Sequence, residues 1–180
     1  MVASEVVAGL RSTPCGRRLL AAADGSEGIW LVGGAVRDML LGNAPRELDV
    51  AVEGDVEPLA RALGGEVLLH ERFGTATVTT EDGCRFDLAR TRTESYAEPG
   101  ALPEVRFAPL GEDLARRDVT VNALAVALPG GHVECVPHAW EDLQQRTLRV
   151  LHDGSFADDP TRLWRVARYA ARLGFTVDEH

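Results

Sequence analysis

The chain has 180 residues, 45% of them hydrophobic and 26% charged, and a formal net charge of −9. This composition predicts a globular protein of one domain, or of one domain with part of another, and excludes a disordered chain. The acidic balance argues against a nucleic-acid-binding surface, because phosphates attract basic residues. All 19 basic residues are arginine, which binds phosphate with a planar fork of donors. Codon bias in a GC-rich genome is the alternative explanation for the arginines.

No apolar stretch approaches the roughly 20 residues of a membrane-spanning helix, and the first 20 residues lack a signal-peptide core. The three cysteines, Cys15, Cys84 and Cys135, have no CxxC spacing. They indicate neither a disulfide framework nor a zinc site. We therefore expect a cytoplasmic protein that makes no membrane contact, and the sequence leaves its oligomeric state open.

Apolar periodicity predicts helices and strands in mixed order, without internal repeats. Helices are expected over residues 1–24, 35–41, 56–63, 112–117 and 160–173. Strands are expected over residues 29–32, 48–52, 66–69, 74–80, 84–89, 122–128 and 132–136. Residues 90–111 are polar, contain three prolines and two glycines, and predict a long loop, which in a compact domain is usually functional or disordered.

Two acidic residues, Glu47 and Asp49, are two positions apart at the predicted strand 48–52. Because side chains alternate between the faces of a strand, both carboxylates project opposite Leu48. Close carboxylates repel each other unless a cation lies between them. Mg²⁺ held by carboxylates and substrate phosphates is the usual arrangement for phosphoryl transfer. A solvated strand face is the simpler alternative.

Asp87 interrupts the apolar strand 84–89. An acid there is costly to bury unless it is paired or bound to a metal. If this strand lies beside residues 48–52, Asp87 completes a cluster of three carboxylates that can hold two metals about 4 Å apart.

A glycine pair, Gly33-Gly34, precedes the short predicted helix that carries Arg37. Glycines let a phosphate approach the backbone closely, and Arg37 can neutralise its charge. We expect Arg37 and Asp38 to point away from the buried side of this helix.

The last predicted helix carries arginines within about 120° of one face at 100° per residue. These are Arg162, Arg165, Arg168 and Arg172. An adjacent stripe is expected to pack against the domain and comprises Leu163, Val166, Ala167, Ala170 and Leu173. A solvated face with i, i+4 ion pairs is the alternative for the arginines.

Three spaced segments resemble known motifs. GGAVRDMLLG at 33–42, followed by PRELD at 45–49, is similar to the first motif of class II CCA-adding enzymes and bacterial poly(A) polymerases. RRDVTVNALA at 116–125 resembles their ribose- and nucleotide-binding motif. DDPTR at 158–162, running on to Phe175, resembles the neck motif that selects the incoming base.

The resemblance implies an α+β fold, with a polymerase-beta-like nucleotidyltransferase head over residues 1–150 and the start of a helical neck over residues 151–180. It implies template-independent addition of CMP or AMP, from CTP or ATP, to the 3′ end of tRNA or another RNA, with Mg²⁺ as cofactor. Poly(A) addition and partial CC- or A-addition are alternatives within the family. A truncated head that binds nucleotide without turnover, and transfer to a small molecule, are alternatives outside it.

The same resemblance assigns roles to residues. Glu47, Asp49 and Asp87 are implied as catalytic metal ligands, with Gly33, Gly34 and Arg37 at the triphosphate. The further nucleotide-binding residues that it implies are Arg117, Asp118, Asn122, Asp159, Arg162, Arg165 and Arg168. Asp118 is implied at the sugar and phosphates, and Asp159 with Arg162 as an amino-acid template that pairs with the base. Arg92, Glu94 and Tyr96 stand in the place of the family's flexible loop.

Several residues depart from the family pattern or suggest only structural roles. Glu47 replaces the usual aspartate but remains a hard oxygen ligand, and residues 135–139 differ from the usual segment. Glu112 with Arg116, and Asp113 with Arg117, are spaced as helix ion pairs. The tryptophans are expected to be core or edge aromatics, and they are Trp30, Trp140 and Trp164.

Overall fold

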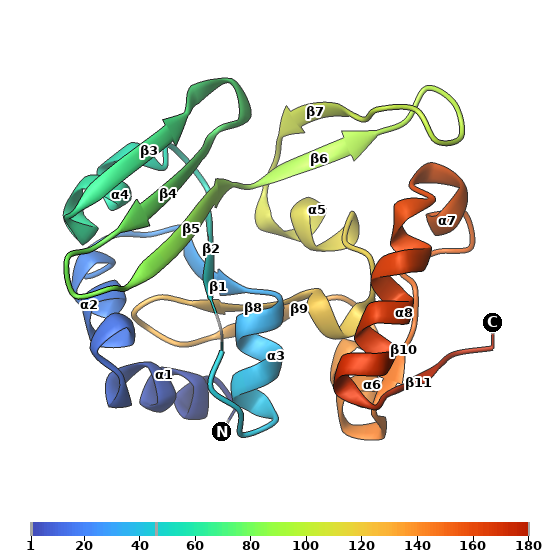
Figure 1. Ribbon diagram of the computed structural model, residues 1–180, viewed down its shortest axis with the longest axis horizontal. Coiled ribbons are helices and arrows are strands. Elements are labelled where there is room, and N and C mark those ends of the chain that lie inside the picture. The colour runs from blue at the N-terminus through green and yellow to red at the C-terminus, as the bar shows by residue number, and fades with distance from the viewer. Residues whose placement is uncertain (1, 46, 180) are drawn as a thin grey trace. The chain divides into compact units, whose positions relative to one another are not determined.

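The computed structural model describes residues 2–45 and 47–179, so the sequence expectations at positions 1, 46 and 180 lie outside the described residues. The chain forms two compact units (Figure 1). The first unit runs through Thr91 and includes Ala125–Glu134, and the second comprises Arg92–Leu124 and the residues from Cys135 onward. The predicted division into a head and a neck at residue 150 stays a prediction.

The first unit is built on a mixed sheet of seven strands in the order β3-β4-β5-β2-β1-β8-β9. Its strands are β1 (Ile29–Val32), β2 (Leu48–Val52), β3 (Glu66–His70), β4 (Thr75–Thr79), β5 (Arg85–Arg90), β8 (Leu124–Ala127) and β9 (Val133–Cys135). Strands β2 and β5 are parallel, whereas β1 pairs antiparallel with β2 and with β8. The sheet places buried apolar side chains such as Leu31, Val50 and Phe86 in the core. The expectation of an α+β fold is confirmed.

Helices and one 3₁₀ turn complete this unit. They are α1 (Val2–Ser12), α2 (Pro14–Ala22), α3 (Gly34–Leu40), α4 (Glu57–Leu63) and the turn η1 (Glu71–Phe73). The predicted helical segment 1–24 is two helices, because Thr13 caps α2 by accepting a hydrogen bond from the Gly16 N–H. The predicted strands and helices of this unit are otherwise confirmed within one or two residues.

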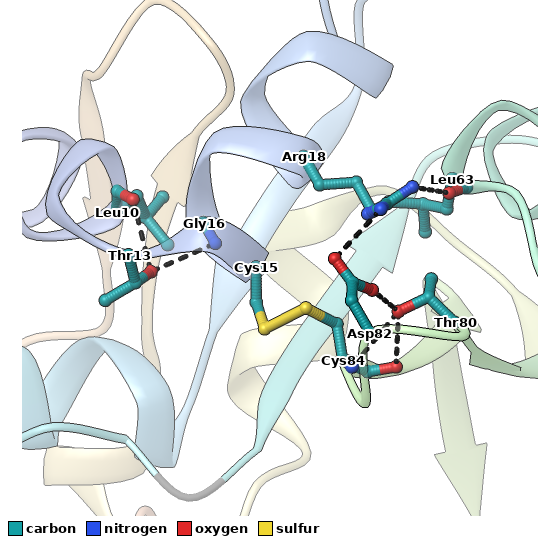
Figure 2. The surroundings of a disulfide bond; sticks show 9 residues. All are labelled: Leu10, Thr13, Cys15, Gly16, Arg18, Leu63, Thr80, Asp82 and Cys84. Atoms are coloured by element: carbon teal, nitrogen blue, oxygen red, sulfur yellow. Dashed lines mark hydrogen bonds and ion pairs between the residues drawn. A yellow bond between two sulfur atoms is a disulfide. The ribbon is translucent and has the colours of Figure 1, made fainter.

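A disulfide joins Cys15 on α2 to Cys84, at the turn that leads into β5 (Figure 2). The two Cα atoms are 5.4 Å apart, although 69 positions separate the residues in sequence. Beside it, Arg18 donates to the Asp82 carboxylate and to the Leu63 carbonyl. The prediction that the cysteines form no disulfide is therefore wrong for this pair, because spacing along the chain does not reveal which elements pack together.

The second unit contains several short elements. They are β6 (Arg92–Ser95), β7 (Glu104–Phe107), α5 (Leu110–Ala115), η2 (Thr120–Asn122), α6 (Ala139–Gln145), β10 (Thr147–Leu148), α7 (Ser155–Asp158), α8 (Thr161–Leu173) and β11 (Thr176–Val177). Strands β6 and β7 pair antiparallel, and β10 pairs parallel with β11. The prediction of a structureless loop over 90–111 is wrong, since both ends of that segment form the β6–β7 hairpin. The prolines between the two strands favour a loop in a sequence-based prediction, so the pairing of the strands was not predicted.

Helix α8 buries a different side from the predicted one. Its buried residues are Arg162, Val166 and Tyr169, while Leu163 is 54% exposed. Trp164, expected in a core or at an edge, is 81% exposed, whereas Trp30 is buried as expected. The predicted packing stripe is confirmed at Val166 and wrong at Leu163 and Ala167, because Arg162 and Tyr169 lie on the packed side instead. Every helix within residues 2–45 and 47–179 is too short or too polar to cross a membrane.

Candidate metal centre and nucleotide-recognition residues

Three carboxylates converge at the centre of the first unit's sheet. Asp49 on β2 is the register partner of Asp87 on β5, and Glu47 lies two positions before Asp49. One oxygen from each of the three lies within 4.8 Å of the others. Asp49 and Asp87 are half-buried, and Glu47 is exposed. The expected juxtaposition of the two strands is confirmed, and the donor set, three hard oxygens, fits a divalent cation such as Mg²⁺.

Asp87 is held in place by two neighbours. Thr77, its register partner on β4, donates from its hydroxyl to Asp87 Oδ1 at 2.7 Å. Arg85, on the same strand face, lies 3.4 Å from the carboxylate, and its side chain is 56% exposed. The sequence did not single out Thr77, although the alternation of Thr75, Thr77 and Thr79 on a strand next to Asp87 is a usable signal.

The glycine turn follows β1, at the end of the sheet where β2 begins. Leu31 pairs with Val50 in antiparallel register, so β1 ends where Glu47 and Asp49 start. Gly33 has φ 64° and ψ −129°, a conformation that favours glycine, and it precedes α3. A Cβ atom on Gly34 would lie 3.3 Å from Nη2 of Arg37. The turn therefore lies at the end of the sheet where Glu47 and Asp49 lie, and its glycines leave the backbone uncovered by side chains. Gly34 packs closely against Arg37.

Arg37 is buried, in contrast to the expectation that it points away from the packed side of its helix. Its side chain is 2% exposed, and its Nε and Nη2 both donate to Asp38 Oδ1, at 2.9 and 2.7 Å. Asp38 is also buried. Burial of both is possible because the two charges neutralise each other, so the apolar periodicity of this short helix was misleading.

In the second unit, Asp118 is a buried acceptor for four donors. Its Oδ1 accepts from the Val119 N–H at 2.9 Å and from the Asn122 amide at 3.1 Å. Its Oδ2 accepts from Arg165 Nε at 2.7 Å and from the Tyr169 hydroxyl at 3.0 Å. Burial would raise the pKa of Asp118, but the Arg165 charge and these hydrogen bonds lower it below 3.8. The carboxylate is therefore ionised and fixed.

A second buried carboxylate, Asp113, anchors α5 and β6. Its oxygens accept from Arg116 at 2.7 Å, from Arg117 at 2.9 Å and from the Arg92 N–H at 3.2 Å. Burial opposes the ionised form, yet the charges of Arg117 and Arg116 hold the pKa of Asp113 below 3.8. The predicted pair with Arg117 is confirmed, whereas Arg116 pairs with Asp113 instead of Glu112.

The residues in the place of the flexible loop form an ordered network. Glu94 accepts from Arg92 at 3.0 Å, from Arg116 at 2.9 Å and from the Tyr96 hydroxyl at 3.1 Å. Burial, followed by the Glu94 charge, raises the pKa of Tyr96. The structure thus ties β6 to α5 through one glutamate.

The residues of the implied base template lie at the start of α8. Asp159 Oδ1 accepts from the N–H and hydroxyl of Thr161, at 2.9 and 2.6 Å. Arg162 is 4% exposed and donates to Ser155 Oγ at 2.8 Å and to the Arg116 carbonyl at 2.9 Å. Arg168, by contrast, is an exposed residue, and its guanidinium carbon lies 5.6 Å from the centre of the Tyr169 ring. Sequence reasoning missed Ser155 and Tyr169, and no sequence signal marks either residue.

Comparison with known proteins gives consistent matches. A family model described as the poly(A) polymerase head domain matches residues 29–149. The chain is 46% identical over 159 residues to an A-adding tRNA nucleotidyltransferase of Geobacter sulfurreducens, covering 84% of this chain and 18% of the relative. It is 48% identical over 150 residues to a CC-adding tRNA nucleotidyltransferase of Deinococcus radiodurans, covering 79% of this chain and 40% of the relative.

Solved structures show the same relationship. An apo form of a CCA-adding enzyme superposes with a TM-score of 0.84 at 32% identity, covering 97% of this chain and 45% of that one. Other similar solved structures are complexes with tRNA, CTP or ATP. The chain spans about a fifth to two fifths of the length of the two curated relatives named above.

Proposed function

Because the chain belongs to the poly(A) polymerase head domain family of class II CCA-adding enzymes, we propose that it is the catalytic head of a tRNA nucleotidyltransferase. In the proposed reaction the 3′-hydroxyl of the RNA attacks the α-phosphorus of CTP or ATP, a phosphodiester bond forms, and pyrophosphate leaves. The observation that carries the proposal is the convergence of Glu47, Asp49 and Asp87 within 4.8 Å.

The three carboxylates are the proposed holders of Mg²⁺. When bound, the ion lowers the pKa of the attacking hydroxyl and neutralises charge on the triphosphate. The protein's own contribution is positioning, because phosphoryl transfer asks for little covalent help. Asp49 and Asp87 are fixed by strand register, and Asp87 is held further by Thr77. The ligand geometry is therefore set by the sheet before substrate arrives.

The turn at Gly33 and Gly34 is the proposed seat of the triphosphate. It lies at the same end of the sheet as Glu47 and Asp49, and neither glycine carries a side chain that would keep a phosphate away. Arg37 lies against Gly34 and is buried with Asp38. We propose that Arg37, paired with Asp38, braces this turn from the buried side of the triphosphate seat.

The second unit is the proposed source of base and sugar recognition. Arg165 and Arg168 are exposed residues of α8 whose guanidinium groups lie beside the Tyr169 ring. Asp159 and Arg162 are proposed to form the base template, and Arg117 and Asn122 to support it. The β6–β7 hairpin, with Arg92, Glu94 and Tyr96, is proposed to act as the family's flexible loop. We also propose that residues 151–180 begin the neck. A cytoplasmic location stays a proposal, in which the Cys15–Cys84 disulfide would be an exception to the reduced thiols usual there.

The relatives do not distinguish which nucleotides this chain would add. The two named relatives add A in one case and CC in the other. Their identities to this chain, 46% and 48%, are too close to separate these activities. Complete CCA addition, addition of CC or of A alone, and poly(A) addition are therefore the outcomes that an assay has to distinguish.

The test is nucleotide incorporation with Mg²⁺ by the full-length protein that contains this chain. Labelled CTP and ATP are supplied with tRNAs ending before the CCA sequence, after the first C and after the second C. Incorporation that disappears in D87N but persists in C135S is expected, because Cys135 is exposed and lies outside the carboxylate cluster. Absence of incorporation into all three tRNAs by the unaltered protein would refute the proposal.

A further inference from the structure

The Asp118 carboxylate has no acceptor position left for a substrate. A carboxylate offers about four lone-pair sites. Four donors occupy them: the Val119 N–H and the Asn122 amide on Oδ1, and Arg165 and Tyr169 on Oδ2. All four contacts lie within the second unit and are between 2.7 and 3.1 Å long. A sugar hydroxyl would have to displace one of them.

Arg165 is the one of these donors that also reaches solvent. Its Nε donates to Asp118, and its side chain is 48% exposed, whereas the Asp118 side chain is 4% exposed. An arginine has five N–H bonds in a planar fork. With Nε fixed on Asp118, the plane of the fork is fixed and its four remaining N–H bonds stay available for an acceptor.

Tyr169 supports the same arrangement from the buried side. It is 8% exposed, donates to Asp118, and lies with its ring 5.9 Å from the Arg165 guanidinium carbon. Arg165 therefore has an anionic partner at Nε and an aromatic neighbour, which together restrict its rotamer.

From this geometry we infer that Asp118 is a positioning residue: it fixes the Arg165 guanidinium over the ring of Tyr169 for the incoming nucleotide, and it does not itself bind the sugar. The inference rests on the proposed function, because it needs a nucleotide to be bound. It differs from the role that the sequence resemblance implied, in which Asp118 contacts the sugar. The two roles predict different responses to removal of the 2′-hydroxyl.

The experiment measures binding of CTP and of 2′-deoxyCTP, with Mg²⁺, to the full chain by calorimetry. Variants D118N, R165Q, their double variant and Y169F are compared with the unaltered protein. In D118N the negative charge is lost and one of the two acceptor oxygens becomes an amide nitrogen, so the guanidinium loses its ionic anchor. We expect D118N and R165Q each to lower the affinity for both nucleotides by the same factor, about tenfold. The ratio of the two affinities stays unchanged, and the double variant is no weaker than the weaker single variant.

Y169F is the matched control. It removes one of the four donors but leaves the bond between Asp118 and Arg165, so affinity for both nucleotides is expected within about twofold of the unaltered protein. It also vacates one acceptor position on Asp118. Under the sugar-binding role that vacancy would strengthen CTP selectively.

Three results overturn the inference. One is a loss of preference for CTP over 2′-deoxyCTP in D118N that R165Q does not share. The second is unchanged CTP binding in R165Q, and the third is selectively stronger binding of CTP in Y169F. If D118N fails to fold, R165Q and Y169F decide the question alone, since Arg165 is half-exposed and its replacement leaves the core intact. Failure of the unaltered protein to bind either nucleotide would instead refute the proposed function.

Discussion

Asp49 and Asp87 face each other across the parallel strands β2 and β5, as register partners. The hydrogen bonds between parallel strands fix which residues are neighbours. The register of β2 and β5 therefore places the two carboxylates side by side. Two close negative charges repel each other. A cation bound between them would relieve that repulsion, so the pairing supports the proposed metal site.

Replacing Asp87 by asparagine should abolish metal binding while preserving the fold. Asparagine keeps the acceptor for Thr77 but removes one of three charges, so repulsion within the cluster falls. We expect binding of Mn²⁺, used as a probe for Mg²⁺, to weaken by more than about 100-fold. Titration followed by the electron paramagnetic resonance of the free ion measures it. Unfolding in urea is expected to show equal or higher stability, and a large loss of stability would assign Asp87 to a structural role.

Replacing Thr77 by valine tests the residue that orients Asp87. Valine has the same shape but cannot donate to Oδ1. Loss of a partner that orients a metal ligand typically weakens metal affinity by about 10- to 100-fold. Serine at the same position keeps the hydroxyl and should bind Mn²⁺ nearly as well as the unaltered protein. Equal affinities in T77V and T77S would show that the hydroxyl has no influence on the site.

Replacing Arg37 by glutamine should unfold the first unit more easily. The substitution removes the charge that neutralises the buried Asp38 carboxylate, which typically costs about 3–5 kcal/mol. R61Q is the matched control, because Arg61 is 76% exposed and pairs with Glu57 one helical turn away. That control should change the free energy of unfolding by no more than about 0.5 kcal/mol. Similar values for R37Q and R61Q in urea unfolding would contradict a structural role for the buried pair.

Much of this arrangement could be predicted from local pattern, because alternation along a strand fixes which side chains share a face. Glu47 and Asp49 were placed together on that ground, and β1 and β2 were predicted with their observed bounds. The parallel register that adds Asp87 was only a conditional expectation. It depends on contacts between segments nearly 40 residues apart, which no local periodicity records.

Other features escaped prediction because apolar periodicity does not record polar pairing. Arg37 is buried with its neighbour Asp38, and Arg162 is buried where it donates to Ser155. The burial of an arginine depends on such partners and not on its helical position alone. The β6–β7 hairpin pairs across a Pro- and Gly-containing connection that resembles a loop. The hydroxyl of Tyr169 donates to Asp118, and no local pattern in the sequence records this contact between distant residues.

Removing the disulfide should lower the stability of the first unit. In the chain-entropy description, a crosslink between residues 69 positions apart stabilises the folded state by about 4 kcal/mol at 25 °C. The variant C15S/C84S should therefore unfold at lower urea concentration, and a reductant should shift the unaltered protein in the same direction. C135S is the control, since Cys135 is exposed and free. If the double variant and the unaltered protein unfold together, the crosslink contributes nothing to stability.

Asp113 should make the second unit's stability depend on acid pH. Burial opposes its charge, but Arg117 and Arg116 hold its folded pKa below the ordinary 3.8. At pH values between the folded pKa of Asp113 and its ordinary pKa, the unfolded chain binds more protons than the folded one. The free energy of unfolding therefore rises with pH in that range. The contribution is complete above about pH 5 and is lost progressively as pH falls through the ordinary and then the folded pKa.

The variant D113N removes that contribution together with two buried ion pairs. At pH 7 it should be less stable by about 3 kcal/mol or more. The gap between it and the unaltered protein should narrow as pH falls below 4, when Asp113 in the unaltered protein also becomes neutral. E112Q, which removes a carboxylate from the exposed side of the same helix, controls for the change in net charge. A gap of constant size from pH 7 to pH 2 in urea unfolding would show that the ionised form of Asp113 does not stabilise the fold.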